Sequence, residues 1–247
     1  MFIDSHCHLI HEQYADDVEN VIKHAVSNGV EKMYCTGGML GHDEKVLELC
    51  AKNRDVLRPV IGISPHDANR VTPEQKNALF DLVEKNRKTL AAIGEIGLDY
   101  HHFHTEEERK TQEALFLQEI ELARSLDLPI VIHSRKAEEK ILNILQKVKF
   151  TNFAMHCFVV KNLAARVVEQ GGFISLPTIK SKERKYIMKH FNLENLLCET
   201  DSPYLWNNGR NEPSNVKEVY ESIAKAKGIS VEKVEEQIEE NVKSFFR

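Results

Sequence analysis

Short apolar runs alternate with longer amphipathic stretches along the whole chain. Runs of five to eight mainly apolar residues are typical of buried β-strands, whereas apolar residues repeating every three to four positions indicate helices. We expect strands at residues 2–8, 31–37, 58–63, 91–97, 129–134, 152–157, 172–176 and 196–200. Amphipathic stretches separate them, so the pattern predicts a strand followed by a helix, repeated along the chain.

Helix-start signals define the first residues of two of the intervening helices. Thr72 and Gln75 form a capping-box pattern with Pro73 at the first helical position, and Thr105 and Glu108 repeat the box. The other predicted helices cover residues 15–28, 42–53, 137–148, 161–170, 181–191, 214–227 and 230–246. In the first of them Val18, Val21, Ile22 and Val26 fit the helical period, and in the helix after Thr105 so do Leu115, Ile120, Leu122 and Ala123.

The number of alternations predicts an α/β fold, a single-domain (β/α)8 TIM barrel with a C-terminal helix. Eight strand–helix units in 247 residues match this barrel in both count and length. A doubly wound sheet is the alternative, but the glycine-rich phosphate-binding fingerprint that would favour it is absent. No linker rich in Pro, Gly or Ser divides the chain, so residues 1–247 are expected to form one domain.

Composition limits the possible binding partners and the cellular compartment of the protein. The formal net charge is −5, which argues against non-specific binding of duplex nucleic acid by charge alone. Five cysteines without a C-x-x-C pair suggest buried free thiols in a reducing compartment. The N-terminus lacks a signal peptide and no apolar run reaches the length of a membrane span, so we expect a cytoplasmic protein with no membrane association. No obligate protein partner is evident.

The first predicted strand ends in two histidines, His6 and His8. Residues two apart on a strand face the same side, so both imidazoles can reach one point, and imidazole is a common ligand of transition metals. An H-x-H pair alone is weak evidence, because two polar residues at a strand end need no metal to explain them.

Later strand ends carry further residues of the same kind. The predicted strands contain or precede Glu95, His133, His156 and Asp201, and the carboxyl ends of TIM-barrel strands meet at the active-site face. Each has an alternative taken alone: His133 and His156 could be core histidines, and Asp201 could cap a helix. Together, four histidines and two carboxylates predict a two-metal site.

The motifs that surround these residues occur in a fixed order along nearly the whole chain. They are DSHCHL (4–9), GEIGLDY (94–100), IHSR (132–135), MHCF (155–158), ETDSPYL (199–205) and RNEPSNV (210–216). In these motifs the chain resembles the TatD-like metal-dependent hydrolases of the amidohydrolase superfamily. The resemblance implies a TIM barrel, a binuclear divalent-metal site and hydrolase activity, often that of a deoxyribonuclease.

Position by position, the resemblance also implies the ligand sets. One metal would be held by His6, His8, Glu95 and Asp201, and the other by Glu95, His133 and His156, with Glu95 bridging the two. Many relatives elsewhere in the superfamily carry a modified lysine where this chain has Glu95. Mixed histidine and carboxylate ligands do not choose among Zn, Mn, Mg, Co, Ni and Fe, so the expected cofactor is two divalent ions of unresolved identity.

Candidate roles follow from this arrangement. Asp201 is predicted to be the general base beside the bridging Glu95, and the alternative is that it serves only as a ligand. His66 and Arg135 are candidates for binding a substrate phosphate, against a plain loop histidine and a surface ion pair. Where many relatives read His-Pro-His, this chain has Ser64 in place of the first histidine.

Two other polar segments are less informative. The three loop histidines His101, His102 and His104 are left outside the metal set, as polar residues of a loop. The basic run 178–185 is expected at the barrel mouth, where it either holds phosphate or simply begins a solvated helix.

Three functions remain at this stage. The leading hypothesis is a metal-dependent deoxyribonuclease that hydrolyses a phosphodiester with a metal-bridging hydroxide, with exonuclease action in the 3′–5′ direction left open against endonuclease action. Its partner would be DNA or another phosphodiester. The alternative is an amide or ester hydrolase, such as a deacylase or a small-molecule amidohydrolase, which can use the same metal pair. A non-catalytic metal-binding scaffold is the third.

Overall fold

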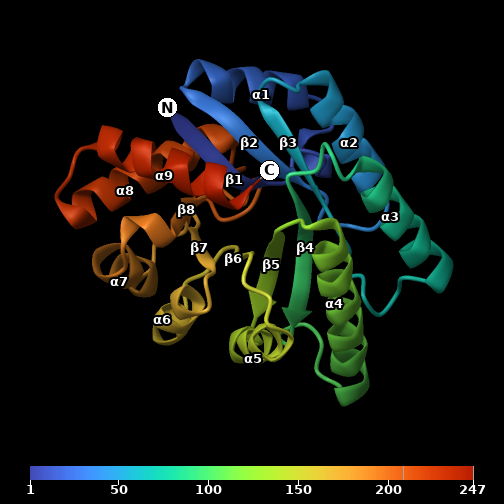
Figure 1. Ribbon diagram of the computed structural model, residues 1–247. Coiled ribbons are helices and arrows are strands. Elements are labelled where there is room, and N and C mark those ends of the chain that lie inside the picture. Colours follow the sequence, from blue (N-terminus) through green and yellow to red (C-terminus); the bar gives the residue numbers. More distant parts are fainter. Residues whose placement is uncertain (208, 247) are drawn as a thin grey trace.

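Eight parallel strands form one sheet that curls into a nearly closed barrel, as the sequence predicts (Figure 1). The structure is a computed structural model and describes residues 1–207 and 209–246. The strands are β1 (Phe2–Cys7), β2 (Val30–Thr36), β3 (Leu57–Ile61), β4 (Ala92–Asp99), β5 (Ile130–Arg135), β6 (Phe153–Met155), β7 (Phe173–Leu176) and β8 (Leu196–Cys198). Each strand pairs with the next one in the sequence, which is the strand order of a TIM barrel.

The barrel closes between its first and last strands through the segment that follows β8. The Asp201 N–H donates to the His6 carbonyl oxygen at 3.0 Å, and the His8 N–H donates to the Ser202 carbonyl oxygen at 2.8 Å. Cys7 and Ser202 form an isolated parallel bridge at the same place. The seam of the barrel is therefore held by the residues that carry the first and last predicted ligands.

Helices cover the outside of the barrel (Figure 1). They are α1 (Val18–Ser27), α2 (Asp43–Lys52), α3 (Pro73–Asn86), α4 (Glu106–Leu126), α5 (Glu138–Val148), α6 (Lys161–Glu169), α7 (Lys182–His190), α8 (Lys217–Lys227) and α9 (Val231–Phe245). Both predicted capping boxes are present, at Thr72 and at Thr105, and α9 is the predicted C-terminal helix. Short 3-10 turns lie at Glu12–Tyr14, Leu193–Asn195 and Pro213–Val216.

Two helix predictions need correction. The helix predicted over 15–28 begins only at Val18, and its buried side is Val21, Ile22 and Ala25, while Val26 is exposed. Val26 lies about 100° around the helix from Ala25, so it turns away from the barrel. The predicted helix 214–227 begins as a 3-10 turn and becomes α-helical only at Lys217, after a proline at the start of that turn.

Several strands end earlier than the sequence predicts. β6 stops at Met155 and β8 at Cys198, so His156 and Asp201 lie just beyond their strands. The backbone leaves the extended conformation there, since Cys157 has φ of 48° and Asp201 has φ of 53°. These turns place the ligand-type side chains at the mouth of the barrel instead of continuing along its wall.

The core is apolar and lies inside the barrel and between its strands and the helices. The helical residues predicted after Thr105 to be buried are so in α4. All five cysteines are free thiols as predicted, but Cys157 is half-buried, because it sits in the turn after β6. Among residues 1–207 and 209–246, no helix combines the length and the apolar character needed to cross a bilayer.

Candidate metal centre

The six predicted ligands converge at the carboxyl ends of the strands. His6 and His8 come from β1 and its end, Glu95 from β4, His133 from β5, and the other two from the turns after β6 and β8. Five of them line a cavity of about 630 Å³, and His6 lies beneath it, fully buried. The remaining lining is mixed, with Met39, Phe158 and Tyr204 among the apolar residues.

His6, His8 and Asp201 form one group, called cluster A below. His6 Nε2 lies 3.1 Å from His8 Nε2, and Asp201 Oδ1 lies 3.3 Å from His8 Nε2 and 3.7 Å from His6 Nε2. Three ligand-type atoms thus surround one point at the seam of the barrel.

Glu95, His133 and His156 form a second group, cluster B. Glu95 Oε2 lies 3.2 Å from His156 Nε2 and 3.9 Å from His133 Nδ1, and these two nitrogens are 3.3 Å apart. The same Glu95 oxygen is 3.6 Å from His6 Nε2 of cluster A. Glu95 therefore stands between the two clusters, where the resemblance places a bridging ligand.

Electrostatics at the two clusters favour a cation. Burial opposes ionisation of Glu95, but the hydrogen bond and charge of His156, with His133 and His8, hold its pKa well below the usual value. Burial and the nearby His156 and His8 lower the pKa of His6 well below its usual value, so its imidazole is neutral. Imidazole nitrogens and carboxylate oxygens are the donors that divalent first-row metals bind, so the residues present fit such ions, which would displace the protons that the raised pKa values of His8 and His156 retain without metal.

His8 behaves differently from its neighbour. Burial lowers its pKa, but the hydrogen bond to Asp201 and the charges of Glu95 and Asp201 outweigh burial and raise the pKa to about 9. An imidazolium here neutralises carboxylates that would otherwise face each other, and a bound cation would do the same.

The imidazoles of cluster A have neutral partners on their outer side. His8 Nδ1 lies 3.2 Å from the carbonyl oxygen of Thr36, and His6 Nδ1 lies 3.5 Å from the Thr36 hydroxyl. Thr36 ends β2, the strand beside β1, so one residue fixes the orientation of both rings.

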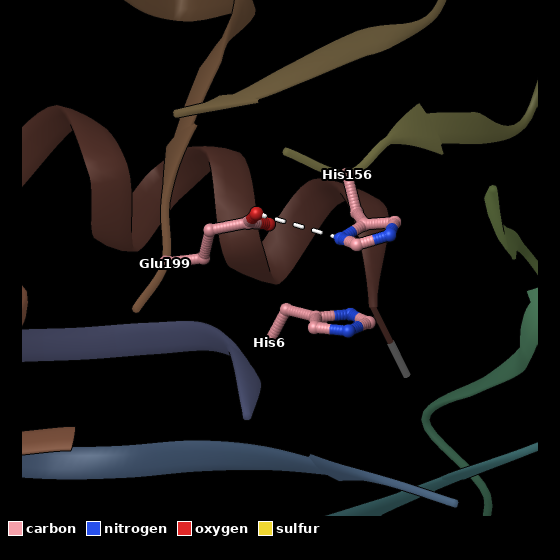
Figure 2. A group of neighbouring side chains, drawn as sticks. All are labelled: His6, His156 and Glu199. Carbon is pink, nitrogen blue, oxygen red and sulfur yellow. Dashed lines mark ion pairs between the residues drawn. The ribbon is translucent and has the colours of Figure 1, made fainter. Parts of the chain in front are cut away.

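The imidazoles of cluster B are backed by buried carboxylates. Glu199 Oε1 lies 3.5 Å from His156 Nδ1, on the side of the ring away from Glu95, and the His6 ring stacks on His156 with centroids 4.1 Å apart (Figure 2). Asp99 Oδ2 lies 3.2 Å from His133 Nε2. Glu199 and Asp99 are both fully buried.

Asp99 is the acceptor for two further histidines. Its Oδ2 lies 2.9 Å from His66 Nε2 and 2.8 Å from His102 Nδ1, and its Oδ1 accepts the N–H groups of His101 and His102. Burial opposes ionisation, but hydrogen bonds from His133, His66 and His102 keep the Asp99 pKa well below its usual range. His102 is thus tied to the site, although its loop position gave no reason to include it.

The two predicted phosphate-binding residues lie at the cavity but differ in their contacts. His66 and Arg135 both line it. His66 is held by Asp99, whereas the Arg135 side chain is exposed and forms no ion pair with any described residue. The surface ion pair considered for Arg135 is therefore not formed, and its guanidinium group is free to meet an anion.

The basic run 178–185 does not reach this cavity. None of its residues lines the cavity, and Ser181 caps α7 instead. Arg184 is buried and paired with Glu218 at 3.2 Å, while Lys180 lies 3.5 Å from the same carboxylate group. The run follows the carboxyl end of β7, where the Thr178 hydroxyl donates to the Leu205 carbonyl oxygen at 3.1 Å, and it begins a helix, which is the second of the two interpretations given for it.

Sequence reasoning missed four residues that contact the ligands: Thr36, Ser64, Asp99 and Glu199. Ser64, in the place where many relatives have histidine, is buried and donates to Glu95 Oε1 at 3.4 Å. A signal existed for the two acids, since a carboxylate within or next to an apolar strand is costly unless it is paired. No sequence pattern marks Thr36.

Comparison with known proteins identifies the lineage. The family model described as TatD related DNase matches residues 3–247. The chain belongs to the TatD family. Human "Deoxyribonuclease TATDN3" is 33% identical to this TatD-family chain, over 99% of it and 94% of the human protein. The Bacillus subtilis (strain 168) "Uncharacterized metal-dependent hydrolase YabD" is 34% identical, over 100% of this chain and 99% of its own length.

Solved structures agree on the TatD-family fold. The Escherichia coli YjjV structure, described as a TatD homolog, superimposes with a TM-score of 0.91 at 23% identity, covering 99% of this chain and 97% of that one. At this identity the likeness speaks for the barrel alone. The family resemblance and the TIM barrel predicted from the sequence are both confirmed.

Proposed function

We propose that this protein is a divalent-metal-dependent hydrolase that cleaves the phosphodiester bonds of DNA. Support comes from membership of a family described as TatD related DNase and from the human relative named a deoxyribonuclease. The −5 net charge does not oppose this, because an anionic substrate would meet bound cations and the free Arg135 locally.

The observation that carries the proposal is the position of Glu95 between the clusters. A single carboxylate oxygen lies 3.6 Å from a nitrogen of cluster A and 3.2 Å from a nitrogen of cluster B. We infer that His6, His8, Asp201 and Glu95 hold one divalent ion and that Glu95, His133 and His156 hold the other. When bound, such a pair polarises a phosphoryl oxygen and lowers the pKa of a nearby water.

The protein's own groups then supply positioning and proton transfer. Asp201 lines the cavity and is nearly buried, so we infer that it accepts the proton of the attacking water on a carboxylate oxygen. His66, held by Asp99, and the unpaired Arg135 would orient the phosphate by charge-assisted hydrogen bonds. The whole chain is proposed to act as one domain, supported by a single contiguous core.

The test joins metal content to cleavage. The purified full-length protein would be measured by elemental analysis and assayed on labelled single-stranded DNA with and without chelator, beside Glu95→Ala. We expect about two metals per chain and cleavage that chelator and the substitution both abolish. Cleavage that survives chelation would overturn the proposal.

A matched substrate panel distinguishes the proposed deoxyribonuclease from the alternative, an amide or ester hydrolase. Acyl and amide substrates would be assayed on the same preparations. Metal-dependent turnover of these, with inert DNA, would move the assignment to an amide or ester hydrolase. The products of DNA labelled at either end would show whether cleavage begins at the 3′ terminus.

A further inference from the structure

The two clusters share Glu95 but differ in what lies behind their histidines. In cluster B, each imidazole has one nitrogen near Glu95 and the other near a buried carboxylate: His133 faces Asp99 at 3.2 Å, and His156 faces Glu199 at 3.5 Å. In cluster A, the outer nitrogens of His6 and His8 face a hydroxyl and a carbonyl of the neutral residue Thr36.

This difference has a chemical consequence for metal binding. A carboxylate behind a metal-ligating imidazole fixes the ring orientation and the tautomer, and it raises the basicity of the nitrogen that faces the metal. For His133, a proton on Nε2 toward Asp99 would leave the Nδ1 lone pair for a metal ion beside Glu95. A hydroxyl or carbonyl acceptor also selects the tautomer, but it adds no negative charge.

The contact between Glu199 and His156 is looser than the contact between Asp99 and His133. His156 Nδ1 is buried and faces Glu199 Oε1 at 3.5 Å without forming a hydrogen bond to it. Glu199 Oε1 is anchored by the N–H of Cys157 at 2.6 Å. The carboxylate is thus fixed in place beside a buried imidazole nitrogen, and it makes no contact with the cavity, since it is absent from the cavity lining.

We propose that Asp99 and Glu199 are positioning residues that make cluster B the higher-affinity metal position, while cluster A is the weaker and exchangeable one. The inference rests on the proposed metal dependence, but not on the identity of the substrate. Cluster B is the permanent position and fills first. Cluster A fills at higher free metal concentration, so the occupancy of His6, His8 and Asp201 sets how much of the protein carries both ions.

The alternative is that ligand charge alone ranks the two positions. Cluster A has its own carboxylate, Asp201, and shares Glu95 with cluster B, so counting first ligands favours cluster A. The two explanations therefore predict opposite orders of filling, and a titration distinguishes them.

The experiment is a calorimetric titration of the metal-free full-length protein with Mn²⁺. Two steps of unequal affinity are expected. His156→Ala should remove the tight step and His8→Ala the weak one, which assigns each step to its cluster. Asp99→Asn and Glu199→Gln should each weaken the tight step by about 10–100-fold and leave the weak step within about twofold.

Thr36→Val is the matched control, because it removes the hydroxyl that faces His6 Nδ1 and leaves the carbonyl contact to His8 in place. It should leave the tight step unchanged. Circular dichroism of each metal-free variant checks folding, and Glu199→Gln keeps an oxygen for the Cys157 N–H. If one variant fails to fold, the other carries the test.

Several outcomes would overturn the inference. These are a tight step that disappears in His8→Ala, two steps of equal affinity, or a tight step unaffected by both carboxylate substitutions. The proposed function is judged separately by DNA cleavage with the metal added in excess. Equal steps with DNA cleavage would refute only the affinity order, and unequal steps without cleavage would refute only the nuclease assignment.

Discussion

The mouth of the barrel and the barrel interior are buried to the same degree but have opposite chemistry. Around β3, β4 and β5, side chains such as Ile61, Ile93 and Ile132 are buried and apolar. At the carboxyl ends of the strands, Asp99 and Glu199 are just as buried and are ionisable. Burying apolar groups stabilises the fold, whereas burying acids costs free energy unless they are paired. The comparison indicates that stability resides in the interior and chemistry at the mouth.

Among the substitutions that test this division between interior and mouth, Asp201→Asn is expected to have the largest effect on activity. Loss of the proposed base and ligand should lower kcat by about 10²–10⁴-fold, because proton transfer to a positioned side chain contributes that much. Stability of the metal-free protein should fall only slightly, since asparagine keeps an oxygen for His8 although it removes the negative charge beside the imidazolium. Steady-state cleavage by the metal-loaded protein would measure the first effect, and thermal unfolding of the metal-free protein would measure the second. A large loss of stability would place Asp201 with the interior instead of the mouth.

The converse change is Phe116→Ala in α4, a fully buried residue. Removing the ring leaves a cavity in the core and should cost about 3–5 kcal/mol of unfolding free energy. Activity well below the melting temperature should stay near that of the parent protein, because Phe116 does not line the cavity. Denaturant unfolding measures the loss of stability, and the cleavage assay checks that activity is retained. The exposed Leu117→Ala is the control and should change stability little.

A third prediction concerns a buried acid that belongs to neither metal cluster. Burial raises the pKa of Asp43, at the start of α2, to about 7, although its contact with the Gly62 N–H works in the other direction. The unfolded chain releases this proton near pH 4, while the folded protein holds it until about pH 7. Asp43 therefore stabilises the fold below pH 4, and this contribution is lost as the pH rises to 7.

Asp43→Asn keeps an acceptor for the Gly62 N–H and removes the titration. Relative to the parent protein, the variant should gain stability between pH 4 and 7, by up to about 4 kcal/mol, and hold that gain above pH 7. Urea unfolding across this pH range measures the gain. Asp55→Asn, an exposed carboxylate, is the control. A constant difference across the range would show that Asp43 does not titrate as described.

The smallest effect is expected at the rim of the mouth. Arg135→Ala should raise KM for DNA by about 10-fold with a smaller change in kcat, since one charge-assisted contact to phosphate is lost. Because the side chain is exposed, stability should not change. Kinetics at two salt concentrations would test this, and an unchanged KM would remove Arg135 from the substrate contacts.

The alternation of apolar and amphipathic segments was enough to predict the barrel, since each strand and helix carries its own periodicity. The ligand-type residues His6, His8, Glu95 and His133 were found because they end or interrupt apolar runs. The turns after β6 and β8 could not be predicted from the hydrophobic pattern of their own segments, because they depend on where the neighbouring strands end.

Contacts between distant segments could not be predicted either, because the hydrophobic pattern describes only each segment by itself. Asp99 meets His66 and His133, which lie 33 and 34 residues away, and Glu199 meets the Cys157 N–H 42 residues away. Such pairs are created by the closed barrel, so only the anomaly of acids in apolar surroundings could be seen beforehand. The exposure of Val26 shows that the sequence pattern alone does not decide burial. Val26 fits the helical period, but the packing of α1 against the barrel buries Ala25 instead.

The seam of the barrel implies an order of events during synthesis. His6 and His8 leave the ribosome first, but their backbone partners, Asp201 and Ser202, come almost two hundred residues later. Glu95, His133 and His156 are all synthesised before that point, whereas cluster A also needs Asp201. If two ions bind as proposed, acquisition of the second would require the segment after the last strand, so full metal loading would mark a closed barrel.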